Sequence, residues 1–307
     1  MNNLKHFLDD LSVKSPLQKK KVSKFFQEND LAAKEANDFI QNYTKYLESE
    51  NISFDKALDS YLELCRDMIT SQIYFIKNGR YPLDQNENQA LEKVYNSEKK
   101  MKSLMIGLAL SQVLWETHYE MFKEFKQQLS SFSNKTFSYL EIGPGHGMFL
   151  NESLQILEKC ERFVAVDISQ TAIDITKSII SFFNGVNNKI EYETKNMMDM
   201  EINEKFDFIT MGEVLEHVNE PEILLKKLRD LLSKEGKGFI STCVNCPSID
   251  HVYHFRKVEE IRQMISNCDL EILSEKVLPV EKMPFDEVVE KKITINYCAI
   301  ISNKNER

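Results

Sequence analysis

The first part of the chain has the pattern of amphipathic helices. Between Leu4 and about Gln128, Gly and Pro are almost absent, and apolar residues return at spacings of three and four. The clearest stretch runs from Ser53 to Lys77, where one face carries Leu58, Tyr61, Leu62, Cys65, Met68, Ile69, Ile73 and Ile76. Ser53 is placed to cap this helix and Gly79 to end it. A further helical pattern opens at Asp84.

Strand-like runs alternate with helical runs in the rest of the chain. The runs FSYLEIG, FVAVDIS, KIEYETKN, FDFITMGEV and KGFISTCV predict strands, and helices are expected from Met148, over Ser169–Phe183, from Asn219 and over KVEEIRQMISN. The closing runs LEILSEKVL and ITINYCAIIS have no predicted helix between them, so they are expected to pair antiparallel.

These elements predict an α/β fold with a Rossmann-like, seven-stranded, mostly parallel and doubly wound sheet that ends in an antiparallel hairpin. An all-α N-terminal domain precedes it. The Ser/Asn-rich segment 130–139 is the best boundary, which gives a helical domain over 1–132 and an α/β domain over 133–307.

A glycine-rich segment, YLEIGPGHGMFL at 139–150, carries the strongest local signal for a ligand site. It predicts a buried strand, a tight turn holding Gly143, Gly145 and Gly147, and a helix. Glycines allow the backbone to turn sharply and let a ligand lie against it without meeting a Cβ. The ligand is therefore expected at the carboxyl end of the first strand of the sheet.

The spacing of this turn separates two kinds of nucleotide site. A dinucleotide fingerprint has G-x-G-x-x-G spacing, but position 148 is Met, which argues against a nicotinamide-dependent oxidoreductase. Glu141 followed by G-x-G-x-G resembles the loop of class I S-adenosylmethionine-dependent methyltransferases. The segment 206–242 and the last hairpin are also similar to small-molecule O-methyltransferases of the ubiquinone-biosynthesis type. This resemblance covers about residues 136–304.

The resemblance implies S-adenosylmethionine as the cofactor. Asp167 ends the second strand, where a carboxylate accepts both ribose hydroxyls of an adenosine. In the family a polar residue at the position of Asn196 reads the adenine amino group; Asp is commoner there. The implied cofactor-binding residues are Glu141, Gly143, Pro144, Gly145, Gly147, Asp167, Ile168, Asn196, Met197 and Glu213.

The segment EVLEHV supplies the candidate catalytic residues Glu213, Glu216 and His217. Their E-x-x-E-H spacing resembles the metal-binding segment of ubiquinone-biosynthesis O-methyltransferases and of small-RNA 3′-end methyltransferases. With His251 they form a hard oxygen and nitrogen ligand set for Mg²⁺, Mn²⁺ or Zn²⁺. Two alternatives stay open: His217 acts as a base or positioning group, or these side chains only line the pocket.

The methyl acceptor is expected against the helical domain. Trp115, His118 and Tyr119 stand one helix before the glycine turn, and aromatic rings with polar tips suit a substrate wall. His251 and His254 are further candidates for substrate contacts.

Charge and composition bear on the partners. Residues 1–135 carry 19 basic and 19 acidic side chains, so the net charge of −9 falls on the α/β part. That balance argues against nucleic acid and for a small-molecule substrate. No signal peptide or membrane span is visible, and the six scattered cysteines suit a reduced, cytoplasmic protein, either a monomer or a homodimer. Cys243 and Cys246 form a lone Cys-x-x-Cys, interpreted as two packed thiols rather than a zinc or redox site.

The leading hypothesis for function is methyl transfer to a hydroxyl of a metabolite, sugar or natural-product intermediate, with or without a metal. N-methylation of a small amine or peptide and a non-catalytic, cofactor-binding partner subunit are the alternatives.

Overall fold

A seven-stranded sheet organises the molecule. The computed structural model describes residues 3–82, 89, 94, 97–132, 137–185, 187 and 189–304. The strands are β1 (Ser138–Ile142), β2 (Arg162–Asp167), β3 (Ile190–Thr194), β4 (Phe206–Gly212), β5 (Leu232–Val244), β6 (Leu270–Pro279) and β7 (Ile295–Asn303). Their order in the sheet is β3-β2-β1-β4-β5-β7-β6. Strands β1 to β5 are parallel, and β7 runs antiparallel to β5 and β6. The predicted fold is confirmed.

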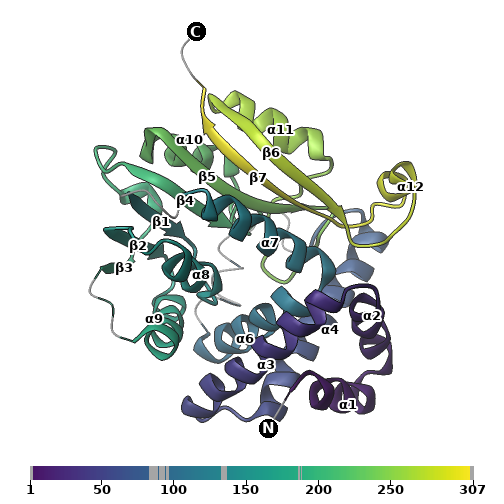
Figure 1. Cartoon of the computed structure of the whole chain (residues 1–307). Helices are drawn as coiled ribbons and strands as arrows, with labels where there is room; N and C mark the ends of the chain where they lie inside the picture. The colour runs from purple at the N-terminus through teal and green to yellow at the C-terminus, as the bar shows by residue number, and fades with distance from the viewer. Residues whose placement is uncertain are drawn as a thin grey trace.

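Helices cover both faces of this sheet, as the buried strands require (Figure 1). One face packs against α10 (Pro221–Leu231) and α11 (Val258–Asn267) through a core that includes Leu140 and Ile142 of β1. The other face packs against α7 (Glu116–Ser130), α8 (Met148–Ile156) and α9 (Gln170–Asn184). Tyr139, which alternates with Leu140 along β1, belongs to this second core.

Two local predictions in this part are wrong. A short helix, α12 (Phe285–Glu290), stands between β6 and β7, where no helix was expected. The helix predicted from Asn219 begins at Pro221 with Glu220 at its N-cap, and no side chain caps it. Pro221 fits the first turn because its fixed φ suits a helix and its missing N–H has no partner to lose there.

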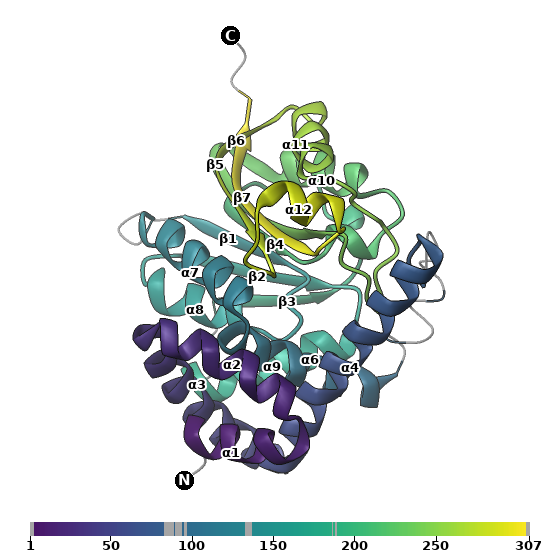
Figure 2. The ribbon, with the colours of Figure 1, turned by 90° about the vertical axis from the view of Figure 1, so that its right-hand side faces the viewer.

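The N-terminal helices share a core with one face of the sheet. They are α1 (Leu4–Lys14), α2 (Pro16–Glu28), α3 (Asp30–Ser49), α4 (Phe54–Asn78) and α6 (Glu98–Leu114). Figure 2 shows α1 to α3 below the sheet, with α4 along one flank. Helix α6 packs on α9, and α7 packs on β6 and β7. The division at 132/133 stays a prediction, since 133–136 lie outside the described residues, as does the start expected at Asp84.

Helix α4 has the ends that the sequence predicts but only half of the expected core face. Ser53 accepts a hydrogen bond from the Lys56 N–H, and Gly79 ends the helix with φ 70°. The apolar face is buried from Leu58 to Cys65, whereas Ile73 is 62% exposed. Ile69 and Ile76 are also exposed. The second half of α4 therefore extends past the core that holds its first half.

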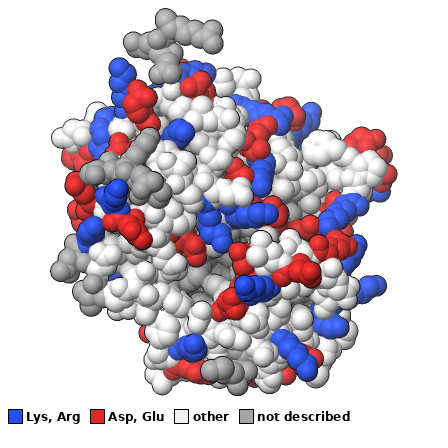
Figure 3. All heavy atoms as spheres, in the orientation of Figure 1, with Lys and Arg blue, Asp and Glu red and all other residues white. Residues whose placement is uncertain are grey.

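Charges of both signs are mixed on the surface. On the face in Figure 3, Lys and Arg side chains alternate with Asp and Glu side chains. Within the described ranges, no helix is both long and apolar enough to span a bilayer.

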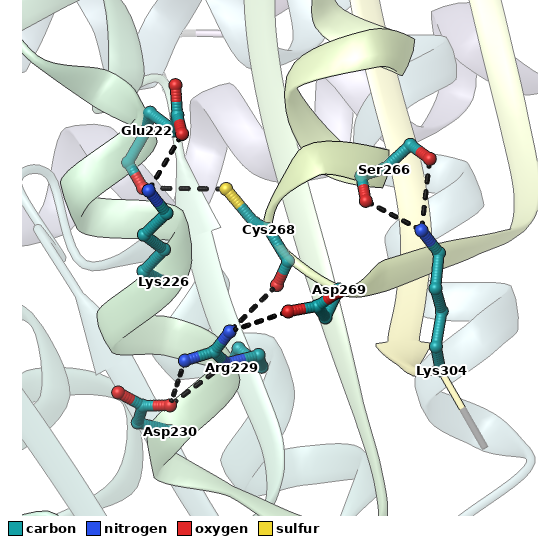
Figure 4. A network of polar contacts seen from close by, with 8 residues as sticks. All are labelled: Glu222, Lys226, Arg229, Asp230, Ser266, Cys268, Asp269 and Lys304. Carbon is teal, nitrogen blue, oxygen red and sulfur yellow. Dashed lines mark hydrogen bonds and ion pairs between the residues drawn. The ribbon is translucent and has the colours of Figure 1, made fainter. Parts of the chain in front are cut away.

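A polar network ties the two outer helices to the end of the sheet (Figure 4). Arg229 of α10 donates to the Asp269 carboxylate at 3.1 Å and to the Cys268 carbonyl at 3.4 Å, just after α11. Lys304, which follows β7, donates to the Ser266 carbonyl of α11 at 2.6 Å. These bonds fix the turn between α11 and β6.

The close approach of α4 and α6 is a point of weakness. A Cβ on Gly107 of α6 would lie 3.0 Å from the Ser60 carbonyl and 3.1 Å from Leu64 Cβ, both on α4. We expect Gly107→Val to push the helices apart and to lower the free energy of unfolding by about 1–3 kcal/mol. Denaturant unfolding measures this loss. Lys102→Val, at an exposed position of the same helix, is the control and should change stability far less; equal losses in both variants would contradict the packing argument.

A buried carboxyl in the sheet predicts a pH dependence of stability. Glu141 is 2% exposed, and the Tyr139 hydroxyl donates to its Oε2 at 2.7 Å. Burial raises the pKa of Glu141 to about 8 from an ordinary 4.5. The unfolded chain therefore releases this proton first as the pH rises. We expect the Glu141 contribution to stability to fall, by up to about 4 kcal/mol, between pH about 5 and about 8 and to level off above that.

Urea unfolding at a series of pH values tests this expectation. Glu141→Gln should remove this fall in stability. Glu191→Gln is the control. The hydrogen bond from Arg162 lowers the pKa of Glu191, so its contribution to stability rises with pH, and the fall due to Glu141 should remain in this variant. Parallel pH profiles for Glu141→Gln and the unsubstituted protein would rule out the buried carboxyl as the cause.

Candidate active site

The glycine turn after β1 takes the conformation that the sequence predicts. Gly143, Gly145 and Gly147 have φ of 68°, 50° and 70°, a region that L side chains rarely adopt. A Cβ on Gly143 would lie 2.8 Å from Val214 Cγ2. Gly147 packs against Thr176 of α9 and is not part of the cavity wall. Gly143 and Gly145 thus shape the site, while Gly147 brings two helices together.

A cavity of about 1040 Å³ opens at the carboxyl ends of the parallel strands. Its floor includes the glycine turn after β1, Asp167 at the end of β2, Glu213 after β4 and Ser241 in β5. Side chains of α2, α4, α6 and α7 form the opposite wall. The cavity therefore lies between the sheet and the N-terminal helices. The sequence predicts the cofactor on the sheet side of this space and the methyl acceptor on the helical side.

The predicted adenosine residues all line this cavity. Asp167 and the half-exposed Ile168 line it, together with Asn196 and Met197 after β3. The Asp167 Oδ1 accepts the Ser169 N–H at 2.8 Å, and burial raises the pKa of Asp167 to about 6. Ser169 caps α9, as expected, by accepting the Ala172 N–H. Backbone N–H groups of the glycine turn and of Ser169 thus hold the Asp167 carboxylate at the cavity edge.

Asn196 has a structural role of its own. Its Oδ1 accepts the Met198 N–H at 3.0 Å and caps the short 3-10 turn η2 (Met197–Asp199). The exposed Asn196 amide and the buried Met197 both border the cavity.

Two glutamates meet behind the end of β4. Glu213 has a positive φ of 53°, and its N–H donates to the Ser241 carbonyl and hydroxyl. Glu216 is fully buried and accepts the Thr242 hydroxyl at 2.8 Å through Oε2. Among the residues that the structure describes, Oε1 of Glu213 and Oε1 of Glu216 have no hydrogen-bond partner.

The environment of this pair favours uncharged carboxyls. Burial, and then the neighbouring Glu216, raises the pKa of Glu213 well above its ordinary range. Burial raises the pKa of Glu216 to about 7. Carboxylate oxygens of Glu213 and Glu216 lie within 4.8 Å of one another. Two buried carboxyls this close must share a proton or a cation.

A histidine and an aspartate line the cavity beside these glutamates. His217 belongs to a second 3-10 turn, η3 (Leu215–His217), and its Nδ1 lies 3.1 Å from the Asp250 carbonyl and 3.6 Å from Asp250 Oδ2. His217, Asp250 and His251 all border the cavity. The rings of His217 and His251 meet edge to face with centroids 4.9 Å apart. Burial lowers the pKa of His251 to about 4, so His251 is neutral.

The predicted metal ligands are brought together only in part. Glu216, His217 and His251 each offer a ligand atom within 4.8 Å of the other two, which suits a divalent cation. Glu213 instead groups with Glu216 and Cys243. The four predicted ligands therefore do not surround one point. Glu213 lies in a separate group that includes the Cys243 thiol.

Two of the three aromatic candidates on the helical side reach the cavity. Trp115 donates to the Tyr61 hydroxyl at 3.0 Å, and His118 Nδ1 lies 2.9 Å from the Ser111 hydroxyl. Both side chains border the cavity, whereas Tyr119 packs in the core outside it. Burial lowers the pKa of His118 to about 4.

His254 is not brought to the cavity. Its ring stacks on Tyr81 with centroids 4.5 Å apart, and its Nε2 lies 2.8 Å from Asn245 Oδ1. The turn that carries it holds it away from the residues that line the site.

Three cavity residues were missed by the sequence analysis. Asp250 precedes His251 directly, and this Asp-His pair was its only signal. His146 lies inside the glycine turn, where its Nδ1 accepts the Met148 N–H at 3.2 Å. Gln112 of α6 approaches His146 Nε2 at 3.5 Å. Helical periodicity identifies apolar faces, so it could not mark Gln112 as a buried polar side chain at the site.

Comparisons with known proteins agree with this arrangement. A family described as "Methyltransferase domain" matches residues 114–275. The chain is 31% identical over 136 residues to the mitochondrial ubiquinone biosynthesis O-methyltransferase of Schizosaccharomyces pombe, which covers 44% of this chain and 48% of that protein. It is 33% identical over 122 residues to the ubiquinone biosynthesis O-methyltransferase of Pelagibacter ubique, covering 39% and 48%. The chain thus spans about half the length of these relatives.

Solved structures share the fold. The N-methyltransferase NodS from Bradyrhizobium japonicum WM9, in complex with S-adenosyl-L-homocysteine, aligns with a TM-score of 0.51 at 17% identity, over 72% of this chain and all of that chain. The mitomycin 7-O-methyltransferase MmcR aligns with a TM-score of 0.54 at 10% identity, over 77% and 67%. Because the matched family spans just over half of the residues, and the sheet order and glycine turn agree with it, this chain belongs to the class I S-adenosylmethionine-dependent methyltransferases.

Proposed function

We propose that this protein transfers a methyl group from S-adenosylmethionine to a hydroxyl of a small molecule. The observation that carries the proposal is one cavity with two chemically different walls. Asp167 and the glycine turn line it with groups that suit an adenosine, and His217 with Asp250 lines it with groups that suit proton transfer. The O-methyltransferase relatives support the choice of a hydroxyl acceptor over an amine.

The first wall suits an adenosine. The Asp167 carboxylate would accept hydrogen bonds from vicinal ribose hydroxyls, and the exposed Asn196 amide, which also lines the cavity, would contact the adenine edge. The positive φ values of Gly143 and Gly145 leave the backbone open to a ligand. S-adenosylmethionine supplies, when bound, a methyl group activated by a sulfonium sulfur.

The second wall suits a proton acceptor. An Nδ1–H donated to the Asp250 carbonyl selects the His217 tautomer whose lone pair is on Nε2. The Asp250 carboxylate at 3.6 Å stabilises the imidazolium that forms when His217 takes a proton from an acceptor hydroxyl. Trp115 and His118 contribute an aromatic, uncharged wall that excludes water and orients the acceptor.

A divalent cation on Glu216, His217 and His251 is a second route to the same end, because it lowers the pKa of a bound hydroxyl. Such an ion would occupy His217 and replace its role as a base. Activity with a chelator and with added Mg²⁺ or Mn²⁺ separates the two routes.

The proposed setting is the cytoplasm. Six buried, unpaired cysteines suit a reducing compartment. The assembly as monomer or homodimer also stays a prediction.

Cofactor binding is the first test. We expect calorimetric titration to give binding of S-adenosylmethionine and S-adenosylhomocysteine but not of NAD⁺. Asp167→Ala should weaken both by about 10- to 100-fold, because it removes hydrogen bonds to a charged acceptor. Asp174→Ala, at an exposed position of the next helix, is the control. No binding of either sulfur nucleoside, or equal binding by both variants, would refute the adenosine site.

Acceptor chemistry is the second test. In a screen of hydroxylated and amine acceptors, we expect turnover of a hydroxyl compound. His217→Gln should lower kcat by about 10²- to 10⁴-fold with cofactor binding intact. Asp250→Asn should lower kcat less, with KM little changed, since Asp250 acts through His217. His6→Gln, an exposed histidine of α1, is the control. Methylation of amines alone would exclude the hydroxyl acceptor, and full activity of His217→Gln would exclude the base.

A further inference from the structure

The lone Cys-x-x-Cys lies beside a buried histidine. Cys243, Cys246 and His251 each offer a ligand atom within 4.8 Å of the other two, and all three side chains are buried. We propose that these three residues bind a zinc ion, with the Glu216 carboxylate as the fourth ligand. Because this ion uses Glu216 and His251, it excludes a second cation on Glu216, His217 and His251 and leaves His217 free to act as the base. The site lies in the cavity wall beside His217, with Cys246 and His251 bordering the cavity and Cys243 and Glu216 outside its lining. It extends beyond the methyl-transfer function.

The backbone turns so that both thiols face the same side. Cys243 is the second-last residue of β5. Asn245, the first residue after the strand, has a positive φ of 50°. The Asn245 N–H donates to the Phe255 carbonyl at 3.0 Å, and its own carbonyl accepts the Thr294 hydroxyl at 2.8 Å. The tight turn that brings Cys246 back toward Cys243 is therefore held on both sides before any ion binds.

The spacing of the ligand atoms fits a tetrahedral ion. The Sγ of Cys243 lies 3.7 Å from Nδ1 of His251. Zinc–sulfur and zinc–nitrogen distances of about 2.3 and 2.0 Å place such atoms about 3.5 Å apart around one ion. Nδ1 also lies 2.6 Å from the Cys246 carbonyl, so coordination through Nδ1 exchanges this hydrogen bond for a bond to zinc.

Glu216 is a second, independent observation that fits a cation at this place. This side chain is fully buried, and among the described residues its Oε1 has no hydrogen-bond partner. The carboxylate lies within 4.8 Å of a ligand atom of His251 and, in another group, of the Cys243 sulfur. An unpartnered buried carboxylate oxygen is costly, and a bound cation removes that cost.

The donor set selects the metal. Two thiols and an imidazole are poor ligands for Mg²⁺ and good ligands for Zn²⁺ in a closed tetrahedral site. Each thiol releases its proton to solvent when it binds, so two thiolates and one carboxylate face the doubly charged ion. The ligands therefore carry a charge of −3 and the zinc complex a net charge of −1.

The ion would also set the position of the catalytic wall. Asp250 lies in the loop between the ligands Cys246 and His251, and Ser248 donates to its Oδ1 at 2.9 Å. Fixing both ends of this short loop fixes the Asp250 carbonyl and carboxylate against His217. Zinc is thus inferred to support the geometry of His217 without contacting the acceptor.

Metal content and cobalt spectroscopy test the site without relying on activity. The full chain, purified from zinc-supplemented cells and dialysed, should contain one zinc per chain. Replacement of zinc by Co²⁺ should give a sulfur-to-cobalt charge-transfer band and intense tetrahedral visible bands. Cys243→Ser and Cys246→Ser should each weaken zinc binding by about 10- to 100-fold or more and roughly halve the charge-transfer band, because one thiolate remains in each variant. Cys268→Ser, a buried cysteine of the network in Figure 4, is the matched control and should keep both signals.

Glu216→Gln provides a second variant. It keeps the thiolates, so we expect weaker zinc binding with the charge-transfer band retained. Cobalt bound by the unsubstituted protein without a thiolate band, zinc retained in both Cys variants, or no zinc at saturating concentration would each overturn the proposal. A Cys243–Cys246 disulfide in freshly purified protein would do so too. Failure of S-adenosylmethionine binding leaves these readouts unaffected, so the two proposals fail separately.

Discussion

The parallel alignment of β1, β2, β4 and β5 is the constraint on which the site depends. Parallel strands end at the same edge of the sheet, so the residues that follow them must share one small space. The chain leaves that edge through positive φ at Gly143, Gly145, Glu213 and Asn245. Only two of these are glycines. Holding Glu213 and Asn245 there costs about 1–2 kcal/mol each, which their buried backbone hydrogen bonds offset.

Burial of acidic groups at this edge determines the electrostatics of the site. Glu141, Glu213 and Glu216 are all removed from water, and burial raises the pKa of each. Glu141 is stabilised by the Tyr139 hydroxyl, whereas Glu213 and Glu216 face one another. A positive charge placed among them, whether a ligand's sulfonium, a protonated His217 or a metal ion, meets a region that favours it.

The sequence predicts the sheet and the floor of the site because both depend on local patterns. Buried parallel strands are short apolar runs, and the glycine turn and Asp167 follow two of them directly. The cap of α4 by Ser53 was likewise a matter of adjacent residues. By contrast, α12 is a short helix with one buried residue, Val288, too few for a periodic signal. Exposure of Ile73 could not be predicted either, since an apolar face on α4 does not reveal where its partner ends.

Residues far apart in sequence make the part of the site around His217, and this explains why the proposed acceptor side was predicted less completely. His217 was visible in EVLEHV, but its partner Asp250 comes from the loop after β5 and meets it only through the fold. The same loop bonds to η3, because the N–H groups of Val252 and Tyr253 both donate to the Glu216 carbonyl. Glu216 therefore holds the loop with its backbone while its side chain faces Cys243 and His251. One residue couples the turn that carries His217 to the loop that orients it, so a change in what Glu216 binds reaches the proposed base without any movement of the sheet.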